Sequence, residues 1–369
     1  LINAKGKVPF KIFDKKNAEK LFGKNLNISA SQLEKFNLCR FSYFCNYGLN
    51  VRERQRAEIN PMQYGTIVHY ILERFFGEYT KEEYLSLEED KFQKIVCAYL
   101  AEYAVKYFGE EQLESNSFTY RLKTILDNVM YLMKHIMEEL SQSEFFVADC
   151  ELKIGEDIPS YTIVLPDGHK IAVCGSVDRV DIMQRADITY LRIIDYKTGT
   201  KQFKLSDILY GINLQMLLYL HSIEASGGDK YGEIVPAGIL YMPATVPYIS
   251  SDSLKSIDKL PDELNKKLKM NGLLLKDTEI IHGMDKTDAA TYIPVKIKAG
   301  EPVSSTSLAT LAEFGKIFKK VDMLIAEMGK NIYNGNIEAK PLKGGHDSCE
   351  YCPYDSVCAY RQSNPRTCF

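Results

Sequence analysis

Three cysteines near the C-terminal end place the strongest constraint on how this chain can fold. The segment CEYCPYDSVC spans residues 349–358 and spaces its thiols as C-x2-C-x5-C. A closed zinc or iron–sulfur site takes four ligands, so the fourth must come from elsewhere in the chain. Spacing alone does not separate the two kinds of site, and by itself it favours zinc. Either site would tie the end of the chain to a distant segment.

The composition indicates a folded protein from a reducing compartment. Of the 369 residues, 45% are hydrophobic and 26% are charged, and the formal net charge is −3. These values argue against bulk affinity for nucleic acid but leave room for a local basic patch. Nine cysteines, an odd number, fit a cytosol better than a secreted disulfide scaffold. Because the sequence has no apolar run of about eighteen residues, we expect no membrane partner.

The hydrophobic pattern predicts one α/β domain. Helical spacing comes first, strand-like alternation follows, and both recur later. A helix is expected from about Ser29, with a capping box formed by Ser31 and Glu34. Further helices are expected at 64–76, 89–107, 118–140, 205–223 and 305–333, and strands at 145–154, 161–165, 170–183, 189–197 and 233–242, with a PDG hairpin turn at 166–168. This order predicts a central mixed sheet flanked by helices.

Two segments stand apart from this pattern. Residues 1–28 are rich in Lys and Asn, and because the chain begins at Leu1 we expect them to be a connector from missing upstream sequence. Residues 243–300 are polar and are expected to be a loop-rich insertion. The domain proper is therefore predicted to span 29–369.

Two predicted strands carry residues that suit a metal site. Asp195 and Lys197 lie two apart, so their side chains share one face of a strand. Asp178 lies on the preceding strand, and pairing of the two strands would bring the carboxylates together. Two carboxylates at one site repel each other unless a cation such as Mg²⁺ lies between them. The alternative is a surface ion pair between Asp195 and Lys197, and we favour the metal site.

Two predicted helices carry polar residues on apolar faces. His69 and Glu73 are four apart on the first, where a structural histidine is the default and a metal ligand is the alternative. Gln215 and Tyr219 are four apart on the second and need hydrogen-bond partners in so apolar a setting. A core hydrogen bond and a supporting role beside the metal are equally compatible with that position.

Taken together, these segments resemble the RecB-type branch of the PD-(D/E)xK nuclease superfamily. Within it they look like the C-terminal nuclease domain of the AddB type, found in bacterial ATP-dependent helicase/deoxyribonucleases. The resemblance covers residue 29 to the end. The matching segments are SASQLEKFNLCRFSYF (29–44), GTIVHYILERFF (65–76), GSVDRVDIM (175–183), IIDYKTG (193–199), NLQMLLYL (213–220), MNGLLLKDTEIIHGMD (270–285) and the cysteine run.

The resemblance implies a restriction-endonuclease-like core and a role for each site residue. His69, Asp178, Asp195 and the backbone carbonyl of Tyr196 would bind Mg²⁺ or Mn²⁺. Lys197 would act on the attacking water, and Gln215 and Tyr219 would support the site.

The resemblance also implies which cysteine supplies the fourth ligand and which group the four cysteines hold. Cys39 would join Cys349, Cys352 and Cys358 in holding a 4Fe–4S cluster that staples the two ends of the domain. Closing so long a loop restricts the unfolded chain by about 5–6 kcal/mol on the loop-entropy model. Cys45 is the competing ligand. Arg40 departs from the family, which often has Pro after the first cysteine.

The function that the resemblance implies is that of a metal-dependent deoxyribonuclease. It would be the exonuclease domain of a helicase–nuclease that processes double-strand-break ends, degrading the 5′-terminated strand during recombinational repair in the bacterial cytoplasm. Its substrate would be single-stranded DNA from an unwound end, its heterodimer partner the A-type subunit of the helicase–nuclease, and its upstream region helicase-like. The alternatives are a structural DNA clamp and a stand-alone CRISPR-associated iron–sulfur exonuclease.

Contacts with DNA are expected near the proposed staple and just past the metal site, where cations and aromatic faces are available. For the aromatic residues the alternative is burial in the core. The candidates are Arg40, Phe41, Tyr43, Phe44 and Tyr47 near the staple, and Lys197, Lys201 and Lys204 past the site.

Overall fold

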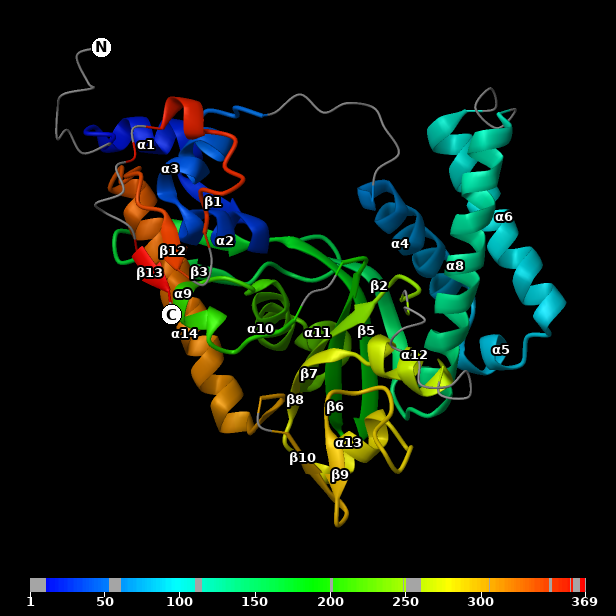
Figure 1. The fold of residues 1–369 in the computed structure, drawn as a ribbon. Coiled ribbons are helices and arrows are strands. Elements are labelled where there is room, and N and C mark those ends of the chain that lie inside the picture. The colour runs from blue at the N-terminus through cyan, green and yellow to red at the C-terminus, as the bar shows by residue number, and fades with distance from the viewer. Residues whose placement is uncertain are drawn as a thin grey trace.

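A six-stranded mixed sheet forms the centre of the computed structural model (Figure 1). The order across the sheet is β11-β8-β7-β6-β5-β2, with β6 parallel to β7 and antiparallel to β5. The strands are β2 (Phe146–Ile154), β5 (Gly175–Arg185), β6 (Ile188–Lys197), β7 (Glu233–Pro243), β8 (Asn271–Leu275) and β11 (Leu308–Ala309). The structure describes residues 11–52, 61–109, 115–199, 202–247, 249, 260–304, 306–344, 347–358, 360 and 366–368. The predicted fold class, a central mixed sheet flanked by helices, is confirmed.

Burial explains the order of the strands. In β6 and β7 most residues are buried on both faces, which suits the middle of a sheet covered by helices. A separate small sheet in the order β1-β4-β3 holds the predicted hairpin: β3 (Thr162–Val164) pairs antiparallel with β4 (Lys170–Val173) around the PDG turn.

Helices cover the sheet in two groups. On one face, α10 (Gln215–Ser226) packs on β6 and β7, and α14 (Leu311–Tyr333) packs on α10. Beside the β2 edge stand α4 (Pro61–Glu78), α6 (Glu89–Phe108) and α8 (Asn116–Ser141), with α4 against both β2 and α6. We call α4, α6 and α8 the helical arm, and Figure 1 shows it as the blue-to-teal group to the right of the sheet.

The first and last segments of the chain lie together. The described part of the predicted connector forms α1 (Lys15–Phe22) and β1 (Asn25–Ile28), and β1 pairs in parallel with β4. Figure 1 shows these blue elements beside the red C-terminal turns. The Ser348 Oγ donates a hydrogen bond to the Leu38 carbonyl at 3.2 Å, which joins the two ends directly.

Shorter elements complete the chain. The helices among them are α2 (Ala30–Leu38), α3 (Arg40–Tyr43), η2 (Phe44–Gly48), α5 (Lys81–Leu85), α9 (Asp207–Tyr210), α11 (Gly228–Tyr231), α12 (Leu260–Leu268), α13 (Thr278–Met284) and η5 (Asp355–Val357). The strands are β9 (Lys296–Lys298), β10 (Glu301–Val303), β12 (Leu342–Gly344) and β13 (Arg366–Cys368). Among the described helices, none has the length and apolar character needed to cross a membrane.

Several local predictions were wrong. The strand predicted at 170–183 is two strands, β4 and β5, which belong to different sheets. The capping box of α2 is formed by Ser29 and Gln32 rather than by Ser31 and Glu34. The helix predicted at 205–223 is two helices, because the chain turns through left-handed conformations at Gly211 (φ 74°) and Asn213 (φ 55°). The stretch 243–300 is not simply loop-rich: β8, within it, is a buried strand of the central sheet paired with β7. The predicted domain boundaries stay predictions.

Candidate metal centre

Strand register places three carboxylates in a row across the central sheet. The pairs Cys150↔Arg179 and Leu152↔Val177 flank Glu151 and set it opposite Asp178. The pair Arg179↔Ile194 sets Asp178, one step further, opposite Asp195. Neighbouring strands lie about 5 Å apart, so side chains in such a row interact directly. The site is therefore built by β2, β5 and β6 together.

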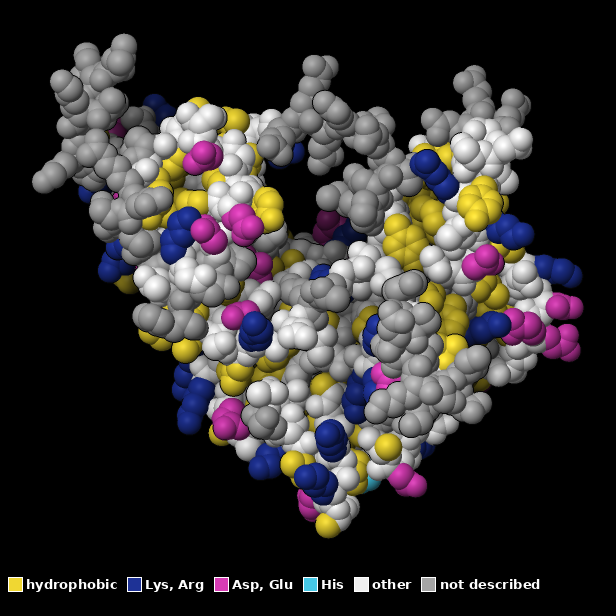
Figure 2. All heavy atoms as spheres, in the orientation of Figure 1, with side chains coloured by type: hydrophobic (Ala, Val, Ile, Leu, Met, Phe, Trp, Pro, Cys, Tyr) yellow, Lys and Arg dark blue, Asp and Glu magenta, His cyan; other side chains and the backbone are white. Residues whose placement is uncertain are grey.

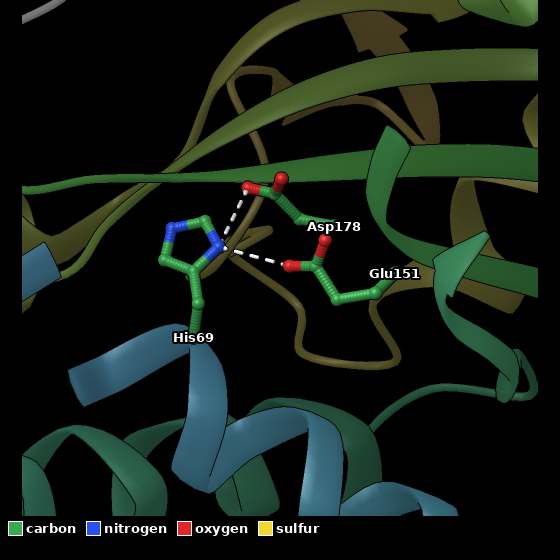
Figure 3. A group of neighbouring side chains, drawn as sticks. All are labelled: His69, Glu151 and Asp178. Carbon is green, nitrogen blue, oxygen red and sulfur yellow. Dashed lines mark hydrogen bonds and ion pairs between the residues drawn. The ribbon is translucent and has the colours of Figure 1, made fainter. Parts of the chain in front are cut away.

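His69 reaches this row from helix α4. Its Nδ1 lies 3.2 Å from Glu151 Oε1 and 3.6 Å from Asp178 Oδ2. Figure 3 shows the imidazole pointing from the helix towards both carboxylates. One ligand atom from each of these three residues lies within 4.8 Å of the others. Nitrogen and oxygen donors at this spacing can surround a divalent cation.

Electrostatics show that this cluster is short of positive charge. Burial, reinforced by the negative charge of Asp195, raises the pKa of Asp178 to about 7. Burial alone would lower the pKa of His69, but its hydrogen bond to Glu151 and the charges of Asp178 and Asp195 raise it overall. Burial alone would raise the pKa of Glu151, but its hydrogen bonds with His69 and Ser176 lower it, so Asp178 is the carboxylate that gains when a cation replaces its proton.

Asp195 and Lys197 share one face of β6, as their spacing predicted. Asp195 is almost fully buried, and its Oδ2 forms an ion pair with the Lys197 ammonium. Between them, the Tyr196 N–H donates to Asp178 Oδ2 at 2.9 Å. Asp178 is therefore fixed by the backbone of the strand that carries the other two residues.

A cavity of about 650 Å³ opens beside His69, Glu151 and Lys197. The metal-site side chains form part of its wall, and two tyrosines of helix α6 form another part. Its lining consists of Gly65, Thr66, His69, Tyr70, Glu73, Tyr103, Tyr107, Glu151, Lys153, Tyr196, Lys197, Thr198 and Gly199. A phosphodiester could thus reach His69, Glu151 and Lys197 from solvent, whereas Asp178 and Asp195 are not among the lining residues.

Sequence reasoning missed Glu151. Its only signal was a carboxylate between Cys150 and Leu152 in a predicted strand, and nothing local to that strand indicates its register with Asp178. Glu151 has a positive φ of 50°, an uncommon conformation for glutamate, and it accepts a hydrogen bond from Ser176 Oγ at 2.8 Å.

Gln215 and Tyr219, the residues predicted to support the metal site, lie on α10. Gln215 is half-buried at the first residue of the helix. Tyr219 is buried, and its hydroxyl occupies the space that a Cβ on Gly175 would need. Their roles at the metal site stay predictions.

Four charged side chains are buried together beneath the site. Arg179 and Arg192, both inaccessible to solvent, bind Asp181 and Glu139. The Arg179 Nη1 also donates to the Tyr196 hydroxyl at 3.3 Å, linking this quartet to the strand that carries the site. We call these four residues the buried quartet. It joins α8 to β5 and β6, so it positions the strands that hold the carboxylates.

Three of the four cysteines predicted to form a staple lie in one side-chain cluster, and Cys349 lies near it. Cys39, between α2 and α3, is buried with Cys45 against Cys352 and Cys358. Burial and the nearby thiols of Cys39, Cys352 and Cys349 raise the pKa of Cys358. The eight cysteines whose side chains are described are free thiols, and no three of their sulfur atoms lie within 4.8 Å of one another.

The predicted aromatic DNA contacts near Cys39 are wrong for two residues. Phe41 and Tyr43 are buried, Phe41 beside the cysteines and Tyr43 in the main core, so neither offers a face to a base. Lys204 is exposed, as a DNA contact requires, whereas Lys201 lies outside the described residues.

Comparison with known proteins decides the family. The model of the PD-(D/E)XK nuclease superfamily matches residues 27–359. This chain belongs to that superfamily. The superfamily's name describes a pair of acidic residues and a lysine. Asp178, Asp195 and Lys197 are residues of these types and lie together in the row described above.

Similar proteins in this superfamily carry the name of the B-type subunit of an ATP-dependent helicase/deoxyribonuclease. The one from Clostridium kluyveri (strain NBRC 12016) is 36% identical over 370 residues, covering 96% of this chain and 32% of that protein. The one from Thermoanaerobacter sp. (strain X514) is 34% identical over 354 residues, covering 93% and 30%. The chain thus spans about a third of the length of these relatives.

Proposed function

We propose that this chain is a divalent-metal-dependent deoxyribonuclease module. The observation that carries the proposal is the convergence of Glu151, Asp178, Asp195, His69 and Lys197 at one end of three adjacent strands. The superfamily membership and the names of the relatives support DNA as the substrate.

The donor set fits Mg²⁺ or Mn²⁺. Asp178 and Asp195 face each other across two strands, and burial keeps water from screening their repulsion. Glu151 and His69, which lie beside Asp178, would complete the set together with the Tyr196 carbonyl. A divalent cation bound here would lower the pKa of a bound water and neutralise charge on a phosphate.

The other residues have defined tasks in this proposal. Lys197, held by Asp195, donates its ammonium towards the attacking water or towards a phosphate oxygen. Ser176 orients Glu151 through its hydrogen bond, and the Tyr196 N–H orients Asp178. In this proposal, a single DNA strand lies in the cavity beside these groups.

The test is cleavage of single-stranded DNA labelled at either end. With Mg²⁺ we expect the 369-residue chain to shorten the strand, and excess chelator to stop the reaction. Comparing 5′-labelled with 3′-labelled strands gives the polarity, for which we propose degradation from the 5′ end. A purified chain that binds DNA and leaves it intact with Mg²⁺ or Mn²⁺ would favour the structural clamp instead.

We also propose that Cys39, Cys349, Cys352 and Cys358 hold a 4Fe–4S cluster. Four thiols gathered from both ends of the chain fit such a group chemically. A single tetrahedral zinc would take the same four thiolates, and the resemblance to the AddB type is what favours the iron–sulfur cluster. Cys45 lies in the same cluster of side chains, and we assign it no ligand role.

Anaerobic purification tests this assignment. We expect about four iron and four sulfide per chain, with visible absorption, in the unaltered protein. Cys39→Ser removes a ligand and should leave less than one iron per chain, whereas the neighbouring Cys45→Ser should leave the cluster intact. Stoichiometric zinc without sulfide, or cluster loss in Cys45→Ser with retention in Cys39→Ser, would contradict it.

In its cellular setting we propose that the module acts in the bacterial cytoplasm within a longer polypeptide. Its relatives' names join helicase to deoxyribonuclease and specify a B-type subunit. They support a helicase-like region upstream and an A-type subunit as the partner. We propose processing of double-strand-break ends for recombinational repair as its role.

A further inference from the structure

The wall of the active-site cavity carries a stack of tyrosines that the chemistry described above does not use. Tyr70 follows His69 on α4, and Tyr103 and Tyr107 lie one turn apart on α6. All three line the cavity over the metal residues. The stack therefore begins one residue from a predicted metal ligand and runs outward along the helical arm.

The rings contact one another in series. The Tyr70 and Tyr103 ring centroids are 5.2 Å apart, and those of Tyr103 and Tyr107 are 4.4 Å apart at an interplanar angle of 35°. Tyr103 is buried, whereas Tyr107 is 55% exposed. The inner rings thus hold the outer one in place and leave much of its surface to solvent. Figure 2 shows apolar and aromatic side chains (yellow) gathered on the helical arm.

Two lysines lie near Tyr107, the outer ring of the stack, or in the same cavity. The Lys106 ammonium lies 5.2 Å from the Tyr107 ring centroid, and Lys153 lines the same cavity. Glu73 is an exposed carboxylate of the cavity lining on α4, and Glu102 on α6 is hydrogen-bonded to Tyr70, whereas Lys106 and Lys153 supply cations at the outer ring and on the strand side. Cations for the phosphates and a fixed aromatic face for a base are what a single strand requires.

We propose that Tyr107, positioned by Tyr103 and Tyr70, is a stacking platform for an unpaired base of the strand whose phosphate lies at the metal residues. The inference rests on the proposed function and names the element that favours a single strand over a duplex. A base within a duplex has both faces covered by its neighbours, whereas an unpaired base can turn onto the ring. Stacking does not depend on base identity, so the platform would favour single strands over duplexes whatever their base sequence.

The test measures binding of labelled oligothymidine with Ca²⁺ in place of Mg²⁺, so that the strand stays intact. Tyr107→Leu should raise the dissociation constant about tenfold, the loss expected for one stacked base. Tyr107→Phe keeps the ring and should stay within about twofold of the unaltered chain. Tyr120→Leu, at a tyrosine that is 72% exposed on α8, is the matched control and should also change binding by less than about twofold.

An abasic scan locates the base. Removing single bases along the oligonucleotide should weaken binding at one position, and Tyr107→Leu should add no further loss on that strand. The chain contains no tryptophan, so Tyr107→Trp adds a single indole whose emission should be quenched by the normal strand and not by the abasic one.

The possible outcomes test the stacking platform separately from the proposed nuclease activity. If the unaltered chain binds and cleaves single strands while Tyr107→Leu binds equally well, the platform is overturned and the proposed function stands. If the unaltered chain neither binds nor cleaves, both are overturned. Equal weakening by Tyr107→Leu and Tyr107→Phe would also overturn the platform, because the ring would then not be the group that matters.

Discussion

Replacing Asp195 by alanine will reduce metal-dependent DNA cleavage by roughly a thousandfold, or about 4 kcal/mol of activation free energy. Asp195 is buried, faces Asp178 across the strand pair and holds Lys197. Its loss would remove a proposed metal ligand and free Lys197, the residue proposed to act on the attacking water. Initial rates with saturating Mg²⁺ measure the effect.

Asp187→Ala is the matched control for Asp195→Ala. Asp187 is exposed in the turn that joins β5 to β6, the same pair of strands, and should leave the rate within about twofold. A rate within tenfold of normal in Asp195→Ala would mean that Asp195 and Lys197 form only the structural ion pair considered as the alternative. The fold itself should survive, because removing Asp195 also removes its repulsion with Asp178.

Replacing Asp181 by alanine will destabilise the fold by about 3–5 kcal/mol. Asp181 is inaccessible to solvent and contacts both Arg179 and Arg192, which would be left with Glu139 as their one remaining carboxylate in the buried quartet. Denaturant unfolding at neutral pH measures the loss. Glu156→Ala, which breaks an exposed ion pair with Lys153, should cost less than about 1 kcal/mol. Equal losses in the two variants would contradict the account.

The pH dependence of this effect has a definite sign. Burial alone would raise the pKa of Asp181, but the charges of Arg179 and Arg192 outweigh it and hold that pKa below its usual range. A lowered carboxyl pKa contributes stability that is fully present above the unfolded-state value, about 3.9, and is lost as the pH falls through the folded-state value. The difference in stability between the unaltered chain and Asp181→Asn should therefore shrink below about pH 4.

Local features of the site were accessible from the sequence. Asp195 and Lys197 share a strand face because they are two residues apart, and that geometry needs no knowledge of the fold. The apolar run of β6 and the PDG turn likewise define their elements from nearest neighbours alone. His69 was among the candidates because an imidazole on an apolar helix face needs a partner.

Features that depend on the pairing of strands far apart in the sequence could not be predicted from the sequence. Glu151 enters the candidate metal site because β2 aligns with β5 in one particular register, and a shift of one residue would turn it to the other face. β8 is a core strand because β7 presents an open edge to it, although its surroundings in sequence are polar. Phe41 and Tyr43 are buried by segments from both ends of the chain, which no window around Cys39 contains.

The most direct test of the account is calorimetric titration of the DNA-free chain with Mn²⁺ at pH 6 and at pH 8. Asp178, with its pKa raised to about 7 by burial and by Asp195, holds a proton at pH 6 that the cation must displace. We predict one site per chain, tighter binding at pH 8, proton release at pH 6 and loss of binding in Asp178→Ala. Binding that is equal at both pH values, or unchanged in Asp178→Ala, would contradict the claim that these carboxylates form a single divalent-cation site.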